Sequence, residues 1–387
     1  MRIAIVTESF APDLNGVAHS VIRTAEHLLR RGHDPVVIAP APPASGPRSD
    51  AGHPYPVIRV PSMSLPRYRS FRVGLPTARL AEALLAHSPD VVHLASPFLL
   101  GARAATLANQ HRLPTVAVYQ TDVASYARAY RLGWGEAAVW RWLRTVHNAA
   151  DRTLAPSSAA ADDLATNGIR RVSIWRRGVD GVRFDPAHRS AALRRELAPG
   201  GELLVGFVGR LAVEKRVDLL ARTCRLPGVR VVVVGDGPAR GDLERQLPGA
   251  VFLGARYGDD LARLYASLDI FAHTGPYETF GQTVQEAMAS GLPVVAPAAG
   301  GPVDLVIPGR TGTLVPPGDG AAIAAAVADL VADQRRRQAY GCTARAVVAD
   351  RTWAAVGDEL IDHYRAVTGV DTVATRPAPV TRYRLAA

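Results

Sequence analysis

Two glutamates, eight residues apart, are the side chains whose type and spacing best suit chemistry on a ligand. Glu278 and Glu286 belong to the stretch Gly275-Pro-Tyr-Glu-Thr-Phe-Gly-Gln-Thr-Val-Gln-Glu286. The pattern predicts Glu278 just before a helix and Glu286 two turns inside it, a separation of about 12 Å along the helix axis. This separation suits a sugar at one end of a diphosphate and a ribose at the other. Paired acids also occur on solvated helix faces, so the spacing alone leaves both interpretations open.

Residues 280–283, Phe-Gly-Gln-Thr, lie between the two acids at the predicted helix start. The unpaired N–H groups and the positive dipole end of a helix N-terminus bind phosphate. Two cations suit the same ligand, because Arg210 follows the predicted strand 203–209 and Lys215 comes five residues later. Such a pair can neutralise a diphosphate leaving group, although two solvated surface cations would give the same pattern. Carboxylates on either side of an anion site indicate a sugar nucleotide.

The composition is that of a globular protein with large cores. The chain has 387 residues, of which 48% are hydrophobic and 21% charged, and this length suggests two or three domains. Residues 1–6 have the pattern of a buried strand rather than a signal peptide, and no apolar run approaches the roughly 20 residues of a membrane span. Cys224 and Cys342 have no disulfide-framework or metal-ligand spacing. We therefore expect a cytoplasmic protein with reduced thiols.

The net charge of +10 favours an anionic partner. Arginine supplies most of the excess in an alanine- and arginine-rich chain, and this composition accounts for part of the charge without function. Neither zinc-finger spacing nor an aromatic ribonucleoprotein motif occurs, so we expect no nucleic acid partner. Residues 66–72 and 126–134 interleave cations with aromatics, and Trp140, Trp142 and Arg144 continue the pattern. These segments either contact an anionic membrane or form an ordinary basic surface.

Predicted buried strands alternate with helices in both halves of the chain, which indicates parallel α/β sheets. A second series of strands begins near residue 203. Residues 176–186, which contain glycines and a proline typical of turns, form the predicted boundary before it. We therefore predict two doubly wound, Rossmann-like domains that face each other across a cleft, over residues 1–177 and 178–352. A final helix at about 353–370 is expected to pack back on the first domain, and residues 371–387 to form a loose tail.

The Asn15-Gly16 pair follows the first predicted strand. Such a pair permits a positive φ that brings backbone close to a ligand, but an ordinary turn would have the same sequence. No G-x-G-x-x-G motif follows this strand, which argues against nicotinamide chemistry.

Taken together, these motifs resemble those of retaining glycosyltransferases of family 4, which have the GT-B fold. The matches keep the family's order over about residues 1–365: Asn15-Gly16, Gly178-Val-Asp180, Phe184, Gly209-Arg210, Lys215, Gly235-Asp-Gly-Pro238, Glu278 and Glu286. The resemblance implies that the first domain binds the acceptor and the second domain binds the donor.

The resemblance also implies a role for each matched residue. Glu278 and the backbone of residues 280–281 hold the donor sugar, and Glu286 holds the ribose. Arg210 and Lys215 bind the diphosphate, which Gly16 approaches from the other domain. The full donor-binding set is then Gly16, Gly209, Arg210, Lys215, Glu278, Thr279, Phe280, Gly281, Gln282, Thr283 and Glu286, with Arg210, Lys215 and Glu278 assigned to catalysis.

Gln120 and Asp122 are expected on the acceptor or sugar side of the site. Many family members carry a histidine where this chain has Gln120, and a glutamine forms hydrogen bonds but cannot titrate. Asp122 either faces a substrate or caps the next helix. The Tyr119-Gln-Thr-Asp122 motif, with Arg177-Gly178-Val-Asp180, is similar to a subgroup of actinobacterial GDP-mannose-dependent α-mannosyltransferases.

The sequence thus predicts a retaining glycosyltransferase that moves a sugar, foremost mannose from GDP-mannose, to a lipid or carbohydrate acceptor with α configuration. Two alternatives remain: a UDP-sugar-dependent transferase acting on a soluble metabolite, or a sugar-nucleotide epimerase or hydrolase on the same fold. We expect no metal site, because no Asp-x-Asp cluster occurs, and no cofactor beyond the nucleoside diphosphate sugar itself. We also expect the protein to lie in the cytoplasm and to contact an anionic membrane.

Overall fold

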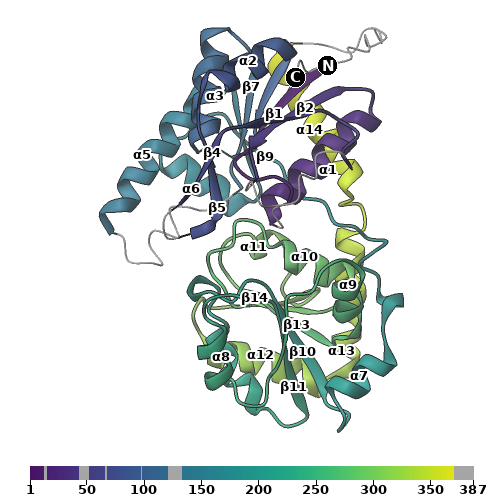
Figure 1. Cartoon of the computed structure of the whole chain (residues 1–387). Coiled ribbons are helices and arrows are strands. Elements are labelled where there is room, and N and C mark those ends of the chain that lie inside the picture. Colours follow the sequence, from purple (N-terminus) through teal and green to yellow (C-terminus); the bar gives the residue numbers. More distant parts are fainter. Residues whose placement is uncertain (13–14, 43–51, 66–67, 97, 121–132, 370–387) are drawn as a thin grey trace. The chain divides into compact units, whose positions relative to one another are not determined.

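The computed structural model describes residues 1–12, 15–42, 52–65, 68–96, 98–120 and 133–369. It divides into two compact units and contains two parallel sheets (Figure 1). The first unit comprises Met1–Val118, Thr145–Leu154 and Gly357–Ala387, and the second comprises Tyr119–Arg144 and Ala155–Val356. Within the described chain, no helix is both long and apolar enough to cross a membrane.

The first sheet has seven strands in the order β3-β2-β1-β6-β7-β8-β9. Its central strand β1 pairs in parallel with both β2 and β6, so the chain winds outward from β1 in two directions. Both faces of β1 are covered, because Ile3, Ala4 and Ile5 are fully buried. The strands are β1 (Arg2–Val6), β2 (Asp34–Pro40), β3 (Val57–Val60), β6 (Val91–Leu94), β7 (Thr115–Val118), β8 (Arg152–Ala155) and β9 (Val172–Ile174).

Helices follow most of these strands: α1 (Gly16–Arg30), α2 (Ala78–His87), α3 (Leu99–Gln110), α5 (Gly133–Ala149) and α6 (Ser158–Thr166). An antiparallel hairpin, β4 (Ser62–Leu65) with β5 (Tyr68–Gly74), was not predicted; it includes part of the basic aromatic segment 66–72. The other such segment, 126–134, lies almost entirely outside the described residues.

The start of α1 corrects the interpretation of Asn15-Gly16. The side-chain oxygen of Asn15 accepts hydrogen bonds from the backbone N–H groups of Val17 and Ala18, at 3.1 and 3.0 Å. Asn15 is therefore an N-cap, and Gly16 is the first helical residue rather than a positive-φ turn residue. The sequence pattern predicts a loop up to Gly16 and a helix from about Ser20, which is four residues late, because the cap was interpreted as part of the loop.

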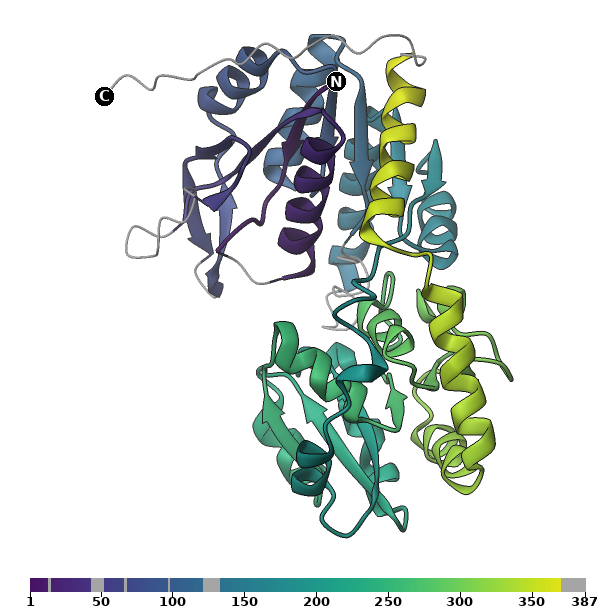
Figure 2. The ribbon, with the colours of Figure 1, turned by 90° about the vertical axis from the view of Figure 1, so that its right-hand side faces the viewer.

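The last helix, α14 (Trp353–Thr368), packs within the first unit (Figure 2). Asp358 pairs with His27 of α1 at 2.8 Å, and the Tyr364 hydroxyl bonds to the His93 ring on β6 at 2.7 Å. A side chain at Gly357 would lie 2.3 Å from the His27 ring, so only glycine lets the two helices approach this closely. His93 is a buried core residue, and burial lowers its pKa to about 3.

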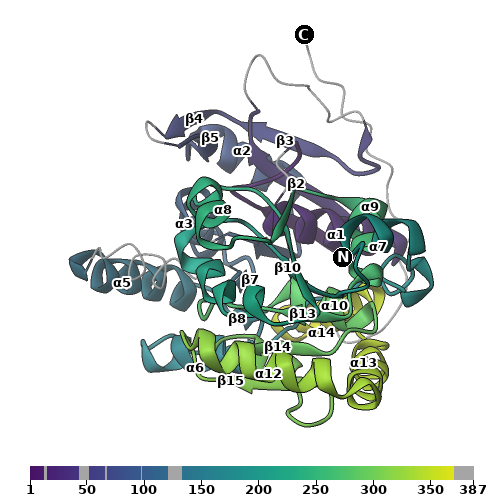
Figure 3. The same cartoon turned by 90° about the horizontal axis from the view of Figure 1, so that it is seen from below.

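The second sheet has six parallel strands in the order β12-β11-β10-β13-β14-β15. Alternate residues of β11 enter different cores: Val232 and Val234 pack into one apolar cluster, Val231 and Val233 into the other. Helices therefore cover both faces (Figure 3). The strands are β10 (Leu203–Val208), β11 (Val229–Val234), β12 (Val251–Gly254), β13 (Ile270–Ala272), β14 (Val294–Pro297) and β15 (Gly312–Val315).

The helices of this sheet are α7 (Ala191–Leu197), α8 (Arg240–Gln246), α9 (Gly258–Ser267), α10 (Gln282–Ala289), α11 (Pro302–Leu305), α12 (Gly320–Ala332) and α13 (Gln334–Val348). Single 3-10 turns complete it: η2 (Pro186–His188), η3 (Val213–Lys215), η4 (Val217–Ala221) and η5 (Thr223–Arg225). Two doubly wound parallel sheets confirm the predicted α/β class.

Candidate active site

The predicted site residues of the second unit gather at the carboxyl ends of β10 and β13. These two strands are neighbours, and the chain winds outward from them toward β12 on one side and β15 on the other. Ligands of open α/β sheets bind in the crevice at such a switch point. The loop after β10 carries Gly209, Arg210 and Lys215, and the loop after β13 carries Glu278.

Lys215 and Glu278 form an ion pair, with 2.7 Å between Nζ and Oε2. The two side chains are only 16% and 20% exposed. Burial on its own raises the pKa of Glu278, but the Lys215 ammonium, the His273 ring and, to the smallest extent, the Arg177 guanidinium outweigh it and bring the pKa to about 2. Glu278 is therefore an anion at every physiological pH, and its oxygens can only accept hydrogen bonds, as the hydroxyls of a sugar require.

Glycines allow the loops around Arg210 to pack closely. A side chain at Gly235 would lie 1.9 Å from the carbonyl oxygen of Gly209, and one at Gly237 would lie 2.3 Å from that of Leu211. The Gly-Asp-Gly turn after β11 thus packs directly against the loop after β10. Arg210, between these turns, is exposed.

The helix between the two acids starts later than the sequence predicted. Gly281 has φ +94°, a left-handed conformation suited to glycine, and α10 begins at the next residue. Only residues 282–286 of the interval are helical, so the helical rise is about 6 Å rather than 12 Å. The first N–H groups of α10, including those of Gln282 and Thr283, have no acceptor within the helix. Phe280 is buried in the core, so only its backbone can meet a ligand.

Glu286 occupies a different electrostatic environment from Glu278. Its two oxygens accept hydrogen bonds from the Tyr265 hydroxyl and the Gln282 amide, both at 3.3 Å. Burial raises the pKa of Glu286 to about 7, although these hydrogen bonds act in the opposite direction. The carboxyl group is thus divided between its two protonation states near neutral pH.

Gln120, just beyond β7, lies beside the Glu278 loop in the second unit. The Arg177 guanidinium donates a hydrogen bond to Gln120 Oε1 at 2.7 Å, and the Thr279 hydroxyl donates to the Gln120 carbonyl at 3.3 Å. No role was predicted for Arg177; the available signal was its place directly before the Gly178-Val-Asp180 motif. Asp122 lies outside the described residues. Gly16 belongs to the first unit, and its approach to a diphosphate stays a prediction.

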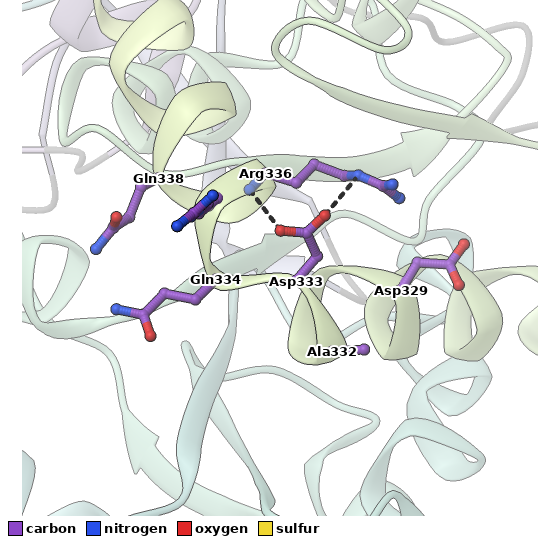
Figure 4. A pocket seen from close by; sticks show the side chains of 7 residues that line it. Asp329, Ala332, Asp333, Gln334, Arg336 and Gln338 are labelled. Carbon is purple, nitrogen blue, oxygen red and sulfur yellow. Dashed lines mark hydrogen bonds and ion pairs between the residues drawn. The ribbon is translucent and has the colours of Figure 1, made fainter.

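Two hollows in the second unit differ in what lines them. Glu278 and Thr279 border a cavity of about 270 Å³, together with Tyr119, Asp163, Tyr277 and Gly300, among others. A larger, open hollow lies at the junction of α12 and α13 (Figure 4). There Asp333 accepts from the Arg336 backbone N–H at 2.9 Å and pairs with its guanidinium at 3.5 Å, so its charge already serves as a helix cap.

No group of histidine, cysteine, aspartate and glutamate side chains suited to a metal ion occurs among the residues that the structure describes. The doubly wound sheets, with a basic loop and two glutamates at the carboxyl ends of the second, define a glycosyltransferase of the GT-B class. The family model described as Glycosyltransferase Family 4 matches residues 14–183, and that described as glycosyl transferases group 1 matches residues 202–333.

Two relatives that match this chain along nearly their whole length identify its family. A GDP-mannose-dependent alpha-mannosyltransferase of Mycobacterium tuberculosis is 50% identical over 95% of this chain and 97% of its own length. The protein of the same name from Mycolicibacterium smegmatis is 51% identical over 95% of this chain and 98% of its own length. The chain belongs to glycosyltransferase family 4.

Solved structures agree on the fold. Anabaena Alr3699/HepE in complex with UDP has a TM-score of 0.79 at 23% identity, covering 95% of this chain and 100% of that one. Sucrose-phosphate synthase from Thermosynechococcus elongatus has a TM-score of 0.80 at 22% identity, covering 95% and 99%. At these identities the likeness establishes the fold alone, and it confirms the predicted GT-B architecture.

Proposed function

We propose that this protein is an α-mannosyltransferase that transfers mannose from GDP-mannose to an acceptor hydroxyl with retained configuration. The observation that carries the proposal is the identity of 45–51% to three proteins named GDP-mannose-dependent alpha-mannosyltransferase, over 94–95% of this chain. The Lys215–Glu278 pair supports it, because a permanently ionised carboxylate at a switch point suits a polyhydroxylated ligand.

Different described residues bind different parts of the donor. Glu278 accepts hydrogen bonds from mannose hydroxyls, and Glu286 accepts from the ribose hydroxyls. The N–H groups at the start of α10, with Arg210, bind the diphosphate. Because negative charge grows on the leaving phosphate as the glycosidic bond breaks, these donors stabilise the transition state more than the ground state.

The reaction replaces one bond to the anomeric carbon by another. The acceptor oxygen bonds to that carbon on the face that the diphosphate leaves, and the acceptor proton passes to the departing phosphate oxygen. This route needs no protein base, and a glutamine at position 120 is compatible with it because an amide does not titrate. It also needs no divalent cation if the cations and α10 carry the charge.

The proposal includes a lipid or glycan acceptor and contact with an anionic membrane. On α5, Trp142 is 43% exposed, and Arg141 and Arg144 are exposed beside it. An exposed indole among arginines suits the interface of an anionic bilayer.

The test is nucleoside diphosphate release from separate donors, GDP-mannose, UDP-glucose and UDP-N-acetylglucosamine, with EDTA present. Each is measured with and without an actinobacterial lipid extract. GDP release that the extract stimulates, with a mannosylated product, is the expected result. Release from a UDP-sugar alone would overturn the donor assignment, and donor consumption without any transfer product would favour an epimerase or hydrolase.

A further inference from the structure

Tyr265 of α9 places a hydroxyl in the core of the second unit, directly behind Glu286. Its side chain is fully buried, and its ring lies 5.6 Å from that of Phe184 and 5.7 Å from that of Phe271, between centroids. The Glu286 side chain, by contrast, is partly exposed. The Tyr265 hydroxyl therefore does not meet a ligand itself, and any effect that it has on one passes through the carboxyl group of Glu286.

The Tyr265 hydroxyl lies within hydrogen-bond distance of two acceptors. Glu286 Oε2 is 3.3 Å away, and the backbone carbonyl oxygen of Thr283 is 3.2 Å away. A phenol has one proton, so it serves only one of these acceptors fully at a time. Burial raises the pKa of Tyr265 well above its ordinary value, and the neighbouring Glu286 adds to the rise, so the hydroxyl keeps this proton. Which acceptor receives it then depends on the charge of Glu286.

The carboxyl group of Glu286 is held from both sides. The Gln282 amide nitrogen donates to Oε1 at 3.3 Å, and it also donates to the Gly178 carbonyl at 3.2 Å, which fixes the amide in place. With Tyr265 at Oε2, the plane of the carboxyl group is set, and each oxygen keeps a lone pair for a further donor. Both partners are uncharged, so a ligand hydroxyl that donates to Glu286 would supply stabilisation that the ionised form lacks.

We propose that Tyr265 is a positioning residue whose hydroxyl donates to ionised Glu286 and so holds the carboxylate in the orientation that accepts hydrogen bonds from ribose hydroxyls. When Glu286 is protonated, the Tyr265 proton turns to the Thr283 carbonyl, and the carboxyl group can donate to the phenol oxygen instead. Only the ionised state then presents acceptors alone to a ribose. This role rests on the proposed function for the class of ligand. The alternative is structural: Tyr265 only fills the core and bonds to the first turn of α10.

Nucleotides with and without ribose hydroxyls separate these roles. The variant is Tyr265→Phe, which keeps the ring and removes the hydroxyl, and the measurement is the calorimetric Kd for GDP and for 2′,3′-dideoxy-GDP at neutral pH. Losing a hydrogen bond to a charged group predicts about 10-fold weaker binding of GDP. The dideoxy nucleotide should bind parent and variant with Kd values within about threefold of each other, because the hydroxyls on which Tyr265 acts are absent from it.

A pH series adds a readout that a structural role would not move. The affinity for GDP relative to dideoxy-GDP, a ratio that cancels titration of the diphosphate, should rise in the parent as Glu286 ionises with its pKa of about 7. Because the Tyr265 hydrogen bond favours the ionised form, Tyr265→Phe should move this rise to higher pH. A 3-fluorotyrosine at position 265 is a stronger donor and should move the rise to lower pH. This second variant carries the test if Tyr265→Phe fails to fold.

The matched control is Tyr364→Phe in the first unit. Tyr364 is also fully buried, and its hydroxyl bonds to the His93 ring at 2.7 Å, so the substitution removes an equivalent buried hydrogen bond away from the donor site. Its Kd for GDP should stay within about threefold of the parent. Thermal melts of both tyrosine variants show how much stability each hydroxyl contributes.

Two results would overturn the positioning role. One is an equal loss of affinity for both nucleotides in Tyr265→Phe, which is the outcome expected if the hydroxyl only supports α10. The other is a Kd for GDP and a pH series that Tyr265→Phe leaves unchanged. If the parent protein binds UDP and not GDP, the donor assignment of the proposed function fails, and the same comparison with UDP and 2′,3′-dideoxy-UDP still decides the role of Tyr265.

Discussion

Removing the cation of the Lys215–Glu278 pair should leave a mostly buried carboxylate without its main partner. Lowering the pKa of Glu278 from its ordinary 4.5 to about 2 corresponds to roughly 3 kcal/mol of favourable interaction with the ionised form. Because the folded pKa is depressed, this stabilisation is present above pH 4.5 and is lost as the pH falls toward 2. We therefore expect Lys215→Met to lower the unfolding free energy by about 3 kcal/mol at pH 7, measured by urea denaturation.

The double variant Lys215→Met/Glu278→Gln tests whether the lost stability comes from the unpaired charge of Glu278. With the carboxylate neutralised, most of the lost stability should return at pH 7, although activity should not. The control is Arg245→Met, because Arg245 and its partner Asp242 are 73% and 65% exposed and such pairs contribute little. If Lys215→Met denatured at the parent's urea concentration, or if the double variant were no more stable than Lys215→Met, the electrostatic account of this pair would be wrong.

Three further substitutions test other parts of the site. Because a pKa of about 7 makes Glu286 ionise between pH 6 and 8, we expect donor affinity of the parent to rise over that range. Glu286→Gln should weaken donor binding and remove this rise; calorimetric Kd values at several pH values check this. Arg210→Ala should reduce kcat by about 100-fold with a smaller effect on donor Kd, as expected for a charge that acts on the leaving phosphate; single-turnover kinetics would reveal an effect confined to binding. Gly235→Ala should lower the melting temperature sharply or prevent folding, because its methyl group would lie 1.9 Å from the Gly209 carbonyl oxygen; an unchanged melt would contradict the close packing of these loops.

Short apolar runs between turns were predicted well, and segments rich in polar or basic residues were not. The sequence predicts strands at residues 57–60, 91–94 and 312–315 and a helix near 78–87, and β3, β6, β15 and α2 have these bounds. Such short runs leave few other assignments. The β4–β5 hairpin was missed because β5 interleaves arginines with aromatics, and this pattern was interpreted as a surface, either contacting an anionic membrane or simply basic, rather than as a strand. The N-cap at Asn15 was also missed. An N-cap and a turn have the same local sequence, and they differ only in where the side-chain oxygen points.

The sequence indicates candidate site residues, but it does not indicate which of them contact each other. Lys215 and Glu278 were both predicted, but their contact joins positions 63 residues apart and depends on β10 and β13 being neighbours in the sheet. Arg177 went unassigned for the same reason, since its partner Gln120 is 57 residues away. A motif can indicate which side chains meet a ligand, whereas their mutual contacts follow from strand order.

The two glutamates of one motif differ because their surroundings push their pKa values in opposite directions. Glu278 precedes α10, next to two cations, and remains an anion. Glu286 lies inside the same helix with only neutral partners, Tyr265 and Gln282, so burial dominates and its pKa rises to about 7. In the proposed donor site, the side assigned to the sugar is therefore charged before any ligand arrives. At the other end, a bound ribose would supply hydroxyl donors that favour the ionised Glu286, so donor binding should draw the second carboxyl group into the same charge state as the first.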